Sequence, residues 1–545
     1  MSLLSHCDPS INVSVRYSSS SNRIYAEAEK RGGCITLSEL SENIKNSPLY
    51  SIGDNMWNLD SDLYIEDGVT LNVIGEELRL LSNSETIVNL RGHGGSLYFD
   101  EARVISWDDS KNAVDENQDD GRSYISCISE VLTGETCLGN AKNDMGECRM
   151  DIFNSEIAYL GYHASESWGL SYKVRGFCKD KSNPEIFDDV RVRGDIKNSL
   201  IHHNYYGHYS FGHLGGVWVN NEIHSNTIYG FDPHDYSEDL IISDNVVYDN
   251  GNHGIIASKW CSNVTITNNV VSTSNVGIFL HSLGDFSTVK NNEVSECDSG
   301  IAYLESSHGI ISGNTLKNNR IGIRFSVGSV NNTVSGNVIE GSETSVSTFP
   351  GSDTPVEADS GRVSMITFSN NVIMGGKIQL RESDNIVFFG NTIDSNVDFR
   401  LQDSSALIMD DVSVSLSGDS CVDSKSLVDG ELCDFEIEEV SETSMNPTQS
   451  STELNLTGTG SPTSAPTTGA PVASVMDAPV APVMDAPVAS VMNTLSPTDS
   501  PTISPVDVET MEPESVNTDA VSGSSKLSFG LKELTIPIIC LFFIK

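Results

Sequence analysis

The chain has few basic side chains for its length. Its 545 residues include 32 lysines and arginines against 76 aspartates and glutamates, which gives a formal net charge of −44 at pH 7. It therefore lacks the basic surface with which proteins displace phosphate counterions, and we exclude nucleic acid as a partner. No CxxC pair occurs among the 11 cysteines, which argues against a structural zinc site or dithiol redox chemistry.

Long hydrophobic runs are also missing. Residues 1–11 contain no apolar core of signal-peptide length, and the apolar tail at 534–544 is too short to span a bilayer. Small residues at 522–524 precede this tail. That order is typical of a lipid-anchor signal, and a frayed hydrophobic end explains it equally well. Disulfides remain the better interpretation of the grouped cysteines, so we expect a secreted or cell-surface protein. Four sequons permit glycosylation there: Asn12, Asn263, Asn331 and Asn455.

An internal repeat organises the body of the chain. An asparagine, then any residue, then an aliphatic one recurs at spacings of 24, 24, 23, 22 and 23 residues, and a glycine marker runs in phase with it. Short β-branched segments alternate with Asn/Gly/Ser turns, and no helical period is present. The pattern predicts an all-β fold, a right-handed parallel β-helix whose inward asparagines stack as ladders. The asparagine markers are Asn221, Asn245, Asn269, Asn292, Asn314 and Asn337, with Asn371 and Asn391 continuing less regularly.

The composition predicts five segments. A leader or cap occupies residues 1–49, and the β-helix catalytic domain spans 50–415. A C-terminal cap at 416–440 is expected to be pinned by Cys421 and Cys433. A Pro/Ser/Thr-rich stalk at 441–525 cannot bury a core, and the hydrophobic tail with its candidate anchor signal fills 526–545. We expect a monomer.

The strand after each repeat glycine carries the chemistry. Its first and third positions are mainly apolar and should point inward, so the second and fourth point outward. In YGFDPHD, residues 229–235, this rule places Asp232 and His234 side by side on the outer face. One coil later Lys259 follows the equivalent strand, so the three side chains can meet on one sugar. The proline inside this strand marks either a strained catalytic turn or a simple coil corner.

These residues resemble the active-site signature of the mannuronan (alginate) C-5 epimerases. The resemblance covers about residues 50–400 and is closest to the non-modular members, since calcium-binding RTX repeats are absent. It implies an isomerase that inverts C-5 of D-mannuronate within an acidic polysaccharide and gives L-guluronate. By the same resemblance His234 is the base, Tyr229 a proton donor or the holder of a donating water, and Asp232 an orienting carboxylate. No cofactor is implied, although calcium could modulate the substrate.

One departure concerns the residue that neutralises the substrate carboxylate. The family members place an arginine at or beside this position, whereas here the basic residue is Lys259, followed by Trp260. Lysine supplies charge but cannot form a bidentate fork. Further substrate-binding candidates, for each of which a structural role is at least as good an explanation, are Asp235, Lys173, His203, Tyr209 and His213.

A polyuronate is an anion, so its binding face must be locally neutral or basic. Residues 173–197 meet this need with seven basic and five acidic side chains. Seven of the 12 histidines fall between 202 and 253, but no dedicated metal-ligand spacing is present, and we predict no metal site.

Two other functions remain open. A polysaccharide lyase on the same fold makes the same C-5 carbanion and then expels the C-4 oxygen. A non-catalytic polysaccharide-binding or adhesion module on a stalk is the alternative from a different class.

Overall fold

The computed structural model describes residues 7–130, 146–164, 166–175, 187, 190–282, 284–351, 361–409, 426–429 and 431–432. The predicted stalk and tail, together with Cys421 and Cys433 of the predicted cap, lie outside these residues. Within the described ranges, no helix has both the length and the apolar character needed to cross a bilayer.

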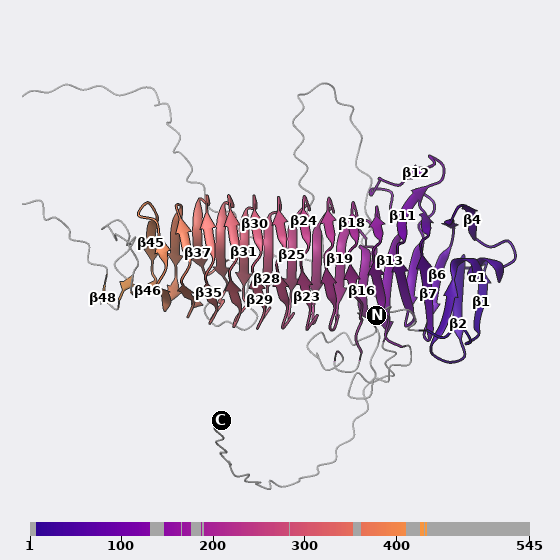
Figure 1. Cartoon of the computed structure of the whole chain (residues 1–545), viewed down its shortest axis with the longest axis horizontal. Helices are drawn as coiled ribbons and strands as arrows, with labels where there is room; N and C mark the ends of the chain where they lie inside the picture. Colours follow the sequence, from indigo (N-terminus) through magenta and orange to yellow (C-terminus); the bar gives the residue numbers. More distant parts are fainter. Residues whose placement is uncertain are drawn as a thin grey trace, which may run out of the picture. The chain divides into compact units, whose positions relative to one another are not determined.

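Three sheets of mainly parallel strands wrap around one core. The chain turns from the first sheet to the second, then to the third, and returns to the first sheet one layer further on (Figure 1). This is the predicted parallel β-helix.

The first sheet contains β1 (Val13–Ser18), β2 (Arg23–Ala28), β6 (Asp62–Glu66), β9 (Asn89–His93), β13 (Tyr124–Glu130), β16 (Gly169–Arg175), β19 (Tyr206–Phe211), β22 (Tyr229–His234), β25 (His253–Ser258), β28 (Val276–His281), β31 (Ser299–Leu304), β34 (Ile321–Ser326), β37 (Thr344–Phe349), β41 (Lys377–Arg381) and β45 (Asp398–Gln402). The second contains β3 (Gly33–Thr36), β7 (Val69–Ile74), β10 (Ser96–Asp100), β14 (Met150–Phe153), β17 (Ile196–Lys197), β20 (Val217–Val219), β23 (Ile241–Ser243), β26 (Thr265–Thr267), β29 (Thr288–Lys290), β32 (Ile310–Ser312), β35 (Thr333–Ser335), β39 (Thr367–Ser369), β43 (Ile386–Phe389), β46 (Ser405–Met409), β47 (Leu427–Val428) and β48 (Glu431–Leu432). The third contains β4 (Leu49–Gly53), β5 (Met56–Leu59), β8 (Glu77–Leu81), β11 (Arg103–Asp108), β15 (Glu156–Ala158), β18 (Leu200–His202), β21 (Glu222–His224), β24 (Val246–Tyr248), β27 (Val270–Ser272), β30 (Glu293–Ser295), β33 (Thr315–Lys317), β36 (Val338–Glu340), β40 (Val372–Met374) and β44 (Thr392–Ile393). Outside these paths lie α1 (Leu37–Glu42), β12 (Ala113–Val114), which pairs with β11, and the pair β38 (Val363–Ser364) and β42 (Ser383–Asp384).

The N-terminal residues already contribute strands to these sheets. Strand β2 pairs with β6 and β3 pairs with β7, and a disulfide joins Cys7 to Cys34 beside them. Helix α1 begins at a capping box in which the Thr36 side chain accepts from the Glu39 backbone and the Glu39 carboxylate accepts from the Thr36 backbone. A second disulfide, Cys127–Cys148, is fully buried in the core.

The strand registers confirm the predicted repeat. Along the third sheet, Ile223 lies opposite Val247, which lies opposite Val271, so each coil in this stretch advances 24 residues. The predicted inward positions of the first sheet, such as Phe231, Ile255 and Ile278, are fully buried. Burial of these stacked apolar side chains holds successive coils together.

The predicted asparagine ladder is present at one corner. From Asn245 through Asn391, each ladder asparagine accepts from the backbone and side-chain amides of the asparagine one coil earlier, at about 2.9 Å. The residue before each one has a positive φ, as at Asn220, Asp244 and Asn268. Only glycine, asparagine and aspartate adopt this conformation readily, which explains the repeated Asn-Asn and Asp-Asn pairs.

Removal of one ladder rung should destabilise the fold. Asn269 accepts from two amides of Asn245 and donates to the Ile242 carbonyl and to Asn292. At ~1–3 kcal/mol per buried group left unpaired, Asn269→Ala should lower the free energy of unfolding by roughly 3 kcal/mol, measured by urea unfolding. Asn268→Gly is the control, because Asn268 is exposed and glycine adopts its φ of 57° without strain. Equal midpoints for the two variants would show that the ladder is energetically unimportant.

Candidate active site

The outer face of the first sheet presents the predicted catalytic residues. In β22, Phe231 points into the core, so Asp232 and His234 lie on the outer face, opposite Tyr209 and Phe211 of β19. Pairing with the next strand, β25, is recorded only at Tyr229 and Phe231. Proline has no N–H to donate to a ladder, which accounts for the interruption at Pro233. The thiol of Cys261 donates to the Pro233 carbonyl instead, at 3.4 Å.

Asp232, His234 and Asp235 form a compact charged group. Nδ1 of His234 lies 3.0 Å from Oδ2 of Asp235, which makes the contact an ion pair when the imidazole is protonated. Burial disfavours the charge on His234, but Asp235 and Asp232 outweigh this effect and raise its pKa. Burial raises the pKa of Asp232 to about 7; Asp235 adds to the shift, whereas His234 and Lys259 oppose it. The Asp232 carboxyl therefore gains or loses its proton near neutral pH, next to the imidazole of His234.

Lys259 lies at the corner that follows β25, one coil beyond His234. Its φ is 52° and that of Trp260 is 56°, a conformation that bulky side chains seldom adopt. The Lys259 N–H donates to the His281 carbonyl at 2.7 Å, which stacks this corner on the next coil. Its charge acts on the pKa of both Asp232 and His234. The structure thus brings the predicted lysine into electrostatic range of the predicted base and its neighbour.

Two tyrosines flank this group. Tyr229 is almost fully buried, stacks on His253 at 5.0 Å between ring centroids, and has its pKa raised by burial and by the Asp232 carboxylate. It is a protonated hydroxyl at neutral pH, as a proton donor must be. The Tyr209 ring lies 5.7 Å from the His234 ring and 4.3 Å from Trp168.

The basic stretch is largely neutralised by acidic neighbours. Lys173 lies on the same outer face, opposite Phe211, with its ammonium 3.5 Å from Glu166 and 4.8 Å from the Trp168 ring. Ion pairs also hold Arg175 to Glu166, Arg191 to Glu238, Arg193 to Glu147 and Lys197 to Asp195. Lys179 and Lys181 lie outside the described residues.

Two predicted binding residues lie elsewhere. His213 is fully buried in the core against Tyr172 and Trp218, and burial lowers its pKa to about 3. This corrects the expectation that it contacts substrate: it is a structural histidine whose Nε2 contacts the Gly194 carbonyl at 3.2 Å.

His203 belongs to a separate histidine cluster. It lies at the corner after β18, stacked on Tyr159 at 4.9 Å, with its Nδ1 2.7 Å from Nδ1 of His202. Burial and the neighbouring charges of His202 and His224 lower its pKa. The ring contacts of His203 are with Tyr159, His202 and His224, so it belongs to this cluster.

The curated proteins that the chain resembles in sequence include mannuronan C5-epimerases. The chain is 27% identical to the mannuronan C5-epimerase AlgG of Azotobacter vinelandii over 301 residues. The aligned region covers 54% of this chain and 53% of that protein. It is 26% identical to the mannuronan C5-epimerase of Pseudomonas aeruginosa, over 44% of this chain and 40% of that one. Over about half of its length, the chain is therefore similar to mannuronan C5-epimerases. The chain spans about half or less of the length of these curated relatives.

A solved structure has a similar fold. The periplasmic alginate epimerase AlgG matches 68% of this chain and 85% of its own, at 22% identity and a TM-score of 0.55. The family model of the periplasmic copper-binding protein NosD matches residues 171–348 and 284–408. In the described ranges, no group of three or more His, Cys, Asp or Glu side chains is arranged to hold a metal ion, so we derive no step through copper.

Aromatic residues that the sequence patterns did not indicate lie beside the candidate charged group. Tyr236 and Trp260 stack at 5.2 Å with ring planes 7° apart, beside Asp235 and Lys259. Phe187 also stacks on Tyr236, with 4.5 Å between the ring centroids. The sequence held a signal for two of them, because Tyr236 directly follows Asp235 and Trp260 directly follows Lys259.

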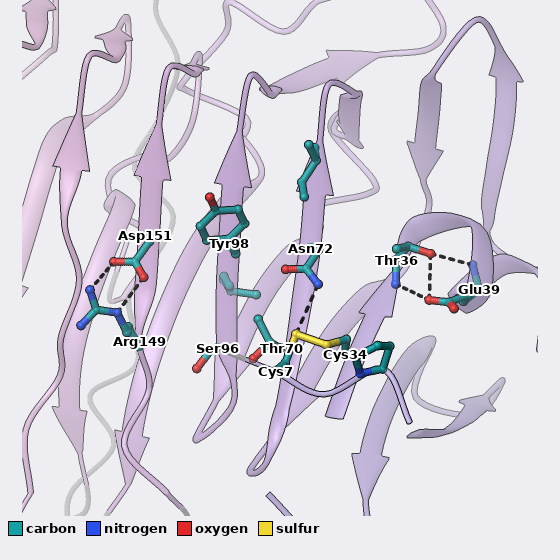
Figure 2. A pocket seen from close by; sticks show the side chains of 13 residues that line it. Cys7, Cys34, Thr36, Glu39, Thr70, Asn72, Ser96, Tyr98, Arg149 and Asp151 are labelled. Atoms are coloured by element: carbon teal, nitrogen blue, oxygen red, sulfur yellow. Dashed lines mark hydrogen bonds and ion pairs between the residues drawn. A yellow bond between two sulfur atoms is a disulfide. The ribbon is translucent and has the colours of Figure 1, made fainter. Parts of the chain in front are cut away.

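A cavity of about 330 Å³ lies far along the second sheet, at the N-terminal end. It is lined by Tyr98, the Cys7–Cys34 disulfide and the Arg149–Asp151 ion pair, among others (Figure 2). None of the candidate catalytic residues lines it, so it is separate from the site on the first sheet.

Proposed function

We propose that this protein is a mannuronan C5-epimerase that converts D-mannuronate to L-guluronate within an alginate-like polymer, outside the cytoplasm. The observation that supports it most is the buried pair Asp232 and His234 on the outer face of β22, with Asp235 against His234 and Lys259 in electrostatic range. The similarity to curated epimerases and to a periplasmic one supports the same reaction and location.

The chemistry needs three functions that these residues can supply. The C-5 proton lies beside a carboxylate, so its removal creates a second negative charge that must be stabilised. Lys259 and the protonated form of Asp232 neutralise that carboxylate. The neutral imidazole of His234 removes the proton through Nε2, because Asp235 engages Nδ1. The Tyr229 hydroxyl, directly or through a water, returns a proton to the opposite face and inverts the centre.

Incubation of polymannuronate with the purified chain tests this proposal. Proton NMR should show guluronate signals replacing mannuronate signals while the polymer length stays constant. A product that absorbs in the ultraviolet, with shortened chains, would establish the lyase instead. Binding of the polymer with neither change would establish the non-catalytic module.

Substitution of Lys259 tests the carboxylate site. Lys259→Ala should lower kcat and raise KM, each by about tenfold, because one charge-assisted contact is lost in both the ground and the transition state. Lys259→Arg keeps the charge and should retain most activity. Lys290→Ala, at an exposed end of β29, controls for loss of one positive charge. Collapse of activity in the arginine variant would mean that another residue holds the carboxylate.

A further inference from the structure

Arg91 is a buried cation on the same outer face as the candidate site. It lies on β9, four strands from β22, which is roughly 19 Å at ~4.8 Å per strand. Only 9% of the residue is exposed. Its Nε donates to the Ser126 hydroxyl at 3.2 Å, and its guanidinium carbon lies 5.1 Å from the Tyr64 ring centroid. Among the residues that the structure describes, no carboxylate lies within ion-pair distance of it.

This lack of an anionic partner sets Arg91 apart from its neighbours. Arg79 and Arg103 on the third sheet pair with Glu77, and Arg149 on the second pairs with Asp151. Burial of a charge is unfavourable unless an opposite charge compensates it. In a chain with a net charge of −44, acidic side chains are abundant, yet none is supplied here. Arg122 is also buried and donates to the Leu160 and Gly161 carbonyls, whereas the contacts of Arg91 in the described ranges are the Ser126 hydroxyl and the Tyr64 ring. A bound anion would add the opposite charge that Arg91 lacks.

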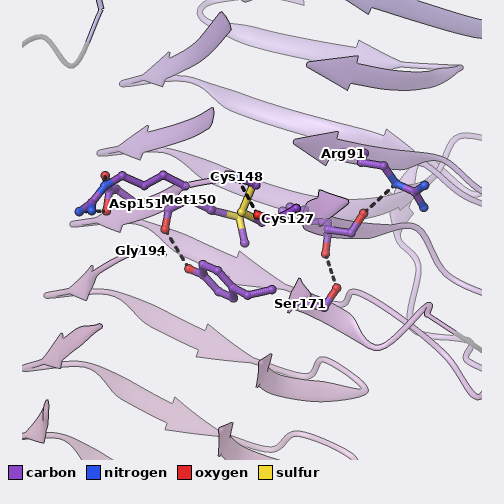
Figure 3. Close-up of a disulfide and its surroundings, with 12 residues drawn as sticks. Arg91, Cys127, Cys148, Met150, Asp151, Ser171 and Gly194 are labelled. Carbon is purple, nitrogen blue, oxygen red and sulfur yellow. Dashed lines mark hydrogen bonds and ion pairs between the residues drawn. A yellow bond between two sulfur atoms is a disulfide. The ribbon is translucent and has the colours of Figure 1, made fainter. Parts of the chain in front are cut away.

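The strand registers connect Arg91 to the candidate site. Outward positions run from Arg91 through Ser126, Ser171 and Tyr209 to Asp232 on successive strands. Figure 3 shows Arg91 and Ser171 on one side of the buried Cys127–Cys148 disulfide, with Asp151 on the other. The intervening Ser126 and Ser171 are almost fully buried, so neither places a long side chain between Arg91 and Tyr209. An extended 1,4-linked sugar chain has a repeat close to the strand spacing, so it can follow the line with its carboxylates toward Arg91.

We propose that Arg91 binds a uronate carboxylate of the same polymer whose reacting sugar lies at His234, and so forms a distal subsite. This inference rests on the proposed function for the identity of the polymer. Arg91 acts in binding and does not touch the reacting atoms. It should therefore set the affinity for chains long enough to span both positions and leave the turnover of bound chains unchanged.

The test uses the full chain carrying His234→Ala, so that binding is measured without turnover. Titration calorimetry with polymannuronate should give about tenfold weaker binding when Arg91→Gln is added, near the lower end of the contribution of one charged hydrogen bond. Arg91→Lys should recover part of the affinity, and Arg103→Gln, on the third sheet, should have no effect. A mannuronate trimer, too short to span four strands, should bind equally with and without Arg91. With His234 intact, Arg91→Gln should raise KM for the polymer and leave kcat unchanged.

Unchanged polymer affinity in Arg91→Gln would overturn the subsite, as would an equal loss for trimer and polymer. A lower thermal midpoint without a change in affinity would assign Arg91 a purely structural role. If the intact chain forms no guluronate but Arg91→Gln still weakens polymer binding, the epimerase proposal fails and the subsite stands.

Discussion

His234→Ala is expected to abolish epimerisation while the fold persists. Nδ1 of His234 lies 3.0 Å from the Asp235 carboxylate, and general-base catalysis contributes ~10²–10⁴-fold to such reactions. We expect kcat to fall at least about a hundredfold, as measured by NMR of polymannuronate during turnover. Far-UV circular dichroism should be unchanged, because the stacked core side chains beneath β22 are untouched.

His224→Ala is the matched control for this variant. His224 lies on the third sheet, stacked on His202 at 5.1 Å and on Tyr248 at 4.8 Å, so its loss removes a histidine without altering the candidate site. It should retain near-normal activity. Retained activity in His234→Ala, or an equal loss in both variants, would exclude His234 as the base.

The pH dependence of the wild type should reflect the same ion pair. The imidazole acts as a base only when neutral, and its pKa is raised above the usual 6.5 by Asp235 and Asp232. The fraction of neutral His234 therefore increases as pH rises through its raised pKa. The acidic limb of kcat/KM should accordingly lie above pH 6.5. Substitution Asp235→Asn removes one of the two carboxylates and should move this limb to lower pH.

The repeat could be predicted from sequence because it depends on local rules. Each ladder asparagine needs a left-handed residue before it and an aliphatic residue two positions later, and both are visible along the chain. Strand alternation correctly placed Asp232 and His234 outside and Phe231 inside. These features follow from backbone geometry at each coil.

Other features depend on contacts between coils and could not be read from one coil. His213 follows a glycine like a surface histidine, but the chain turns inward there and places it between Tyr172 and Trp218. The basic excess of residues 173–197 disappears because Glu147 and Glu238, distant in sequence, pair with it. Arg91 stands out only once its lack of such a partner is known.

Asp232→Asn is expected to make the protein more stable at pH 8 and less active. The pKa of Asp232 is raised from 3.8 to about 7, so the folded state binds a proton more tightly than the unfolded state does. The contribution of Asp232 to wild-type stability is therefore greatest below pH 4 and is lost as pH rises through about 7. Asparagine never ionises. Its variant should gain up to roughly 4 kcal/mol over wild type at pH 8, at ~1.4 kcal/mol per pKa unit, and little at pH 4.

The combination of greater stability and lower activity distinguishes a functional carboxylate from a structural one. Asparagine still donates a hydrogen bond to the substrate carboxylate, but it cannot share a proton with it, so kcat should fall at least about tenfold. Calorimetric midpoints at pH 4 and pH 8, with NMR turnover on the same samples, measure both effects. Asp239→Asn, at an exposed corner, controls for loss of one negative charge. A lower midpoint at pH 8 would mean that the ionised carboxylate stabilises the fold, because its favourable contacts with His234 and Lys259 would then outweigh its burial.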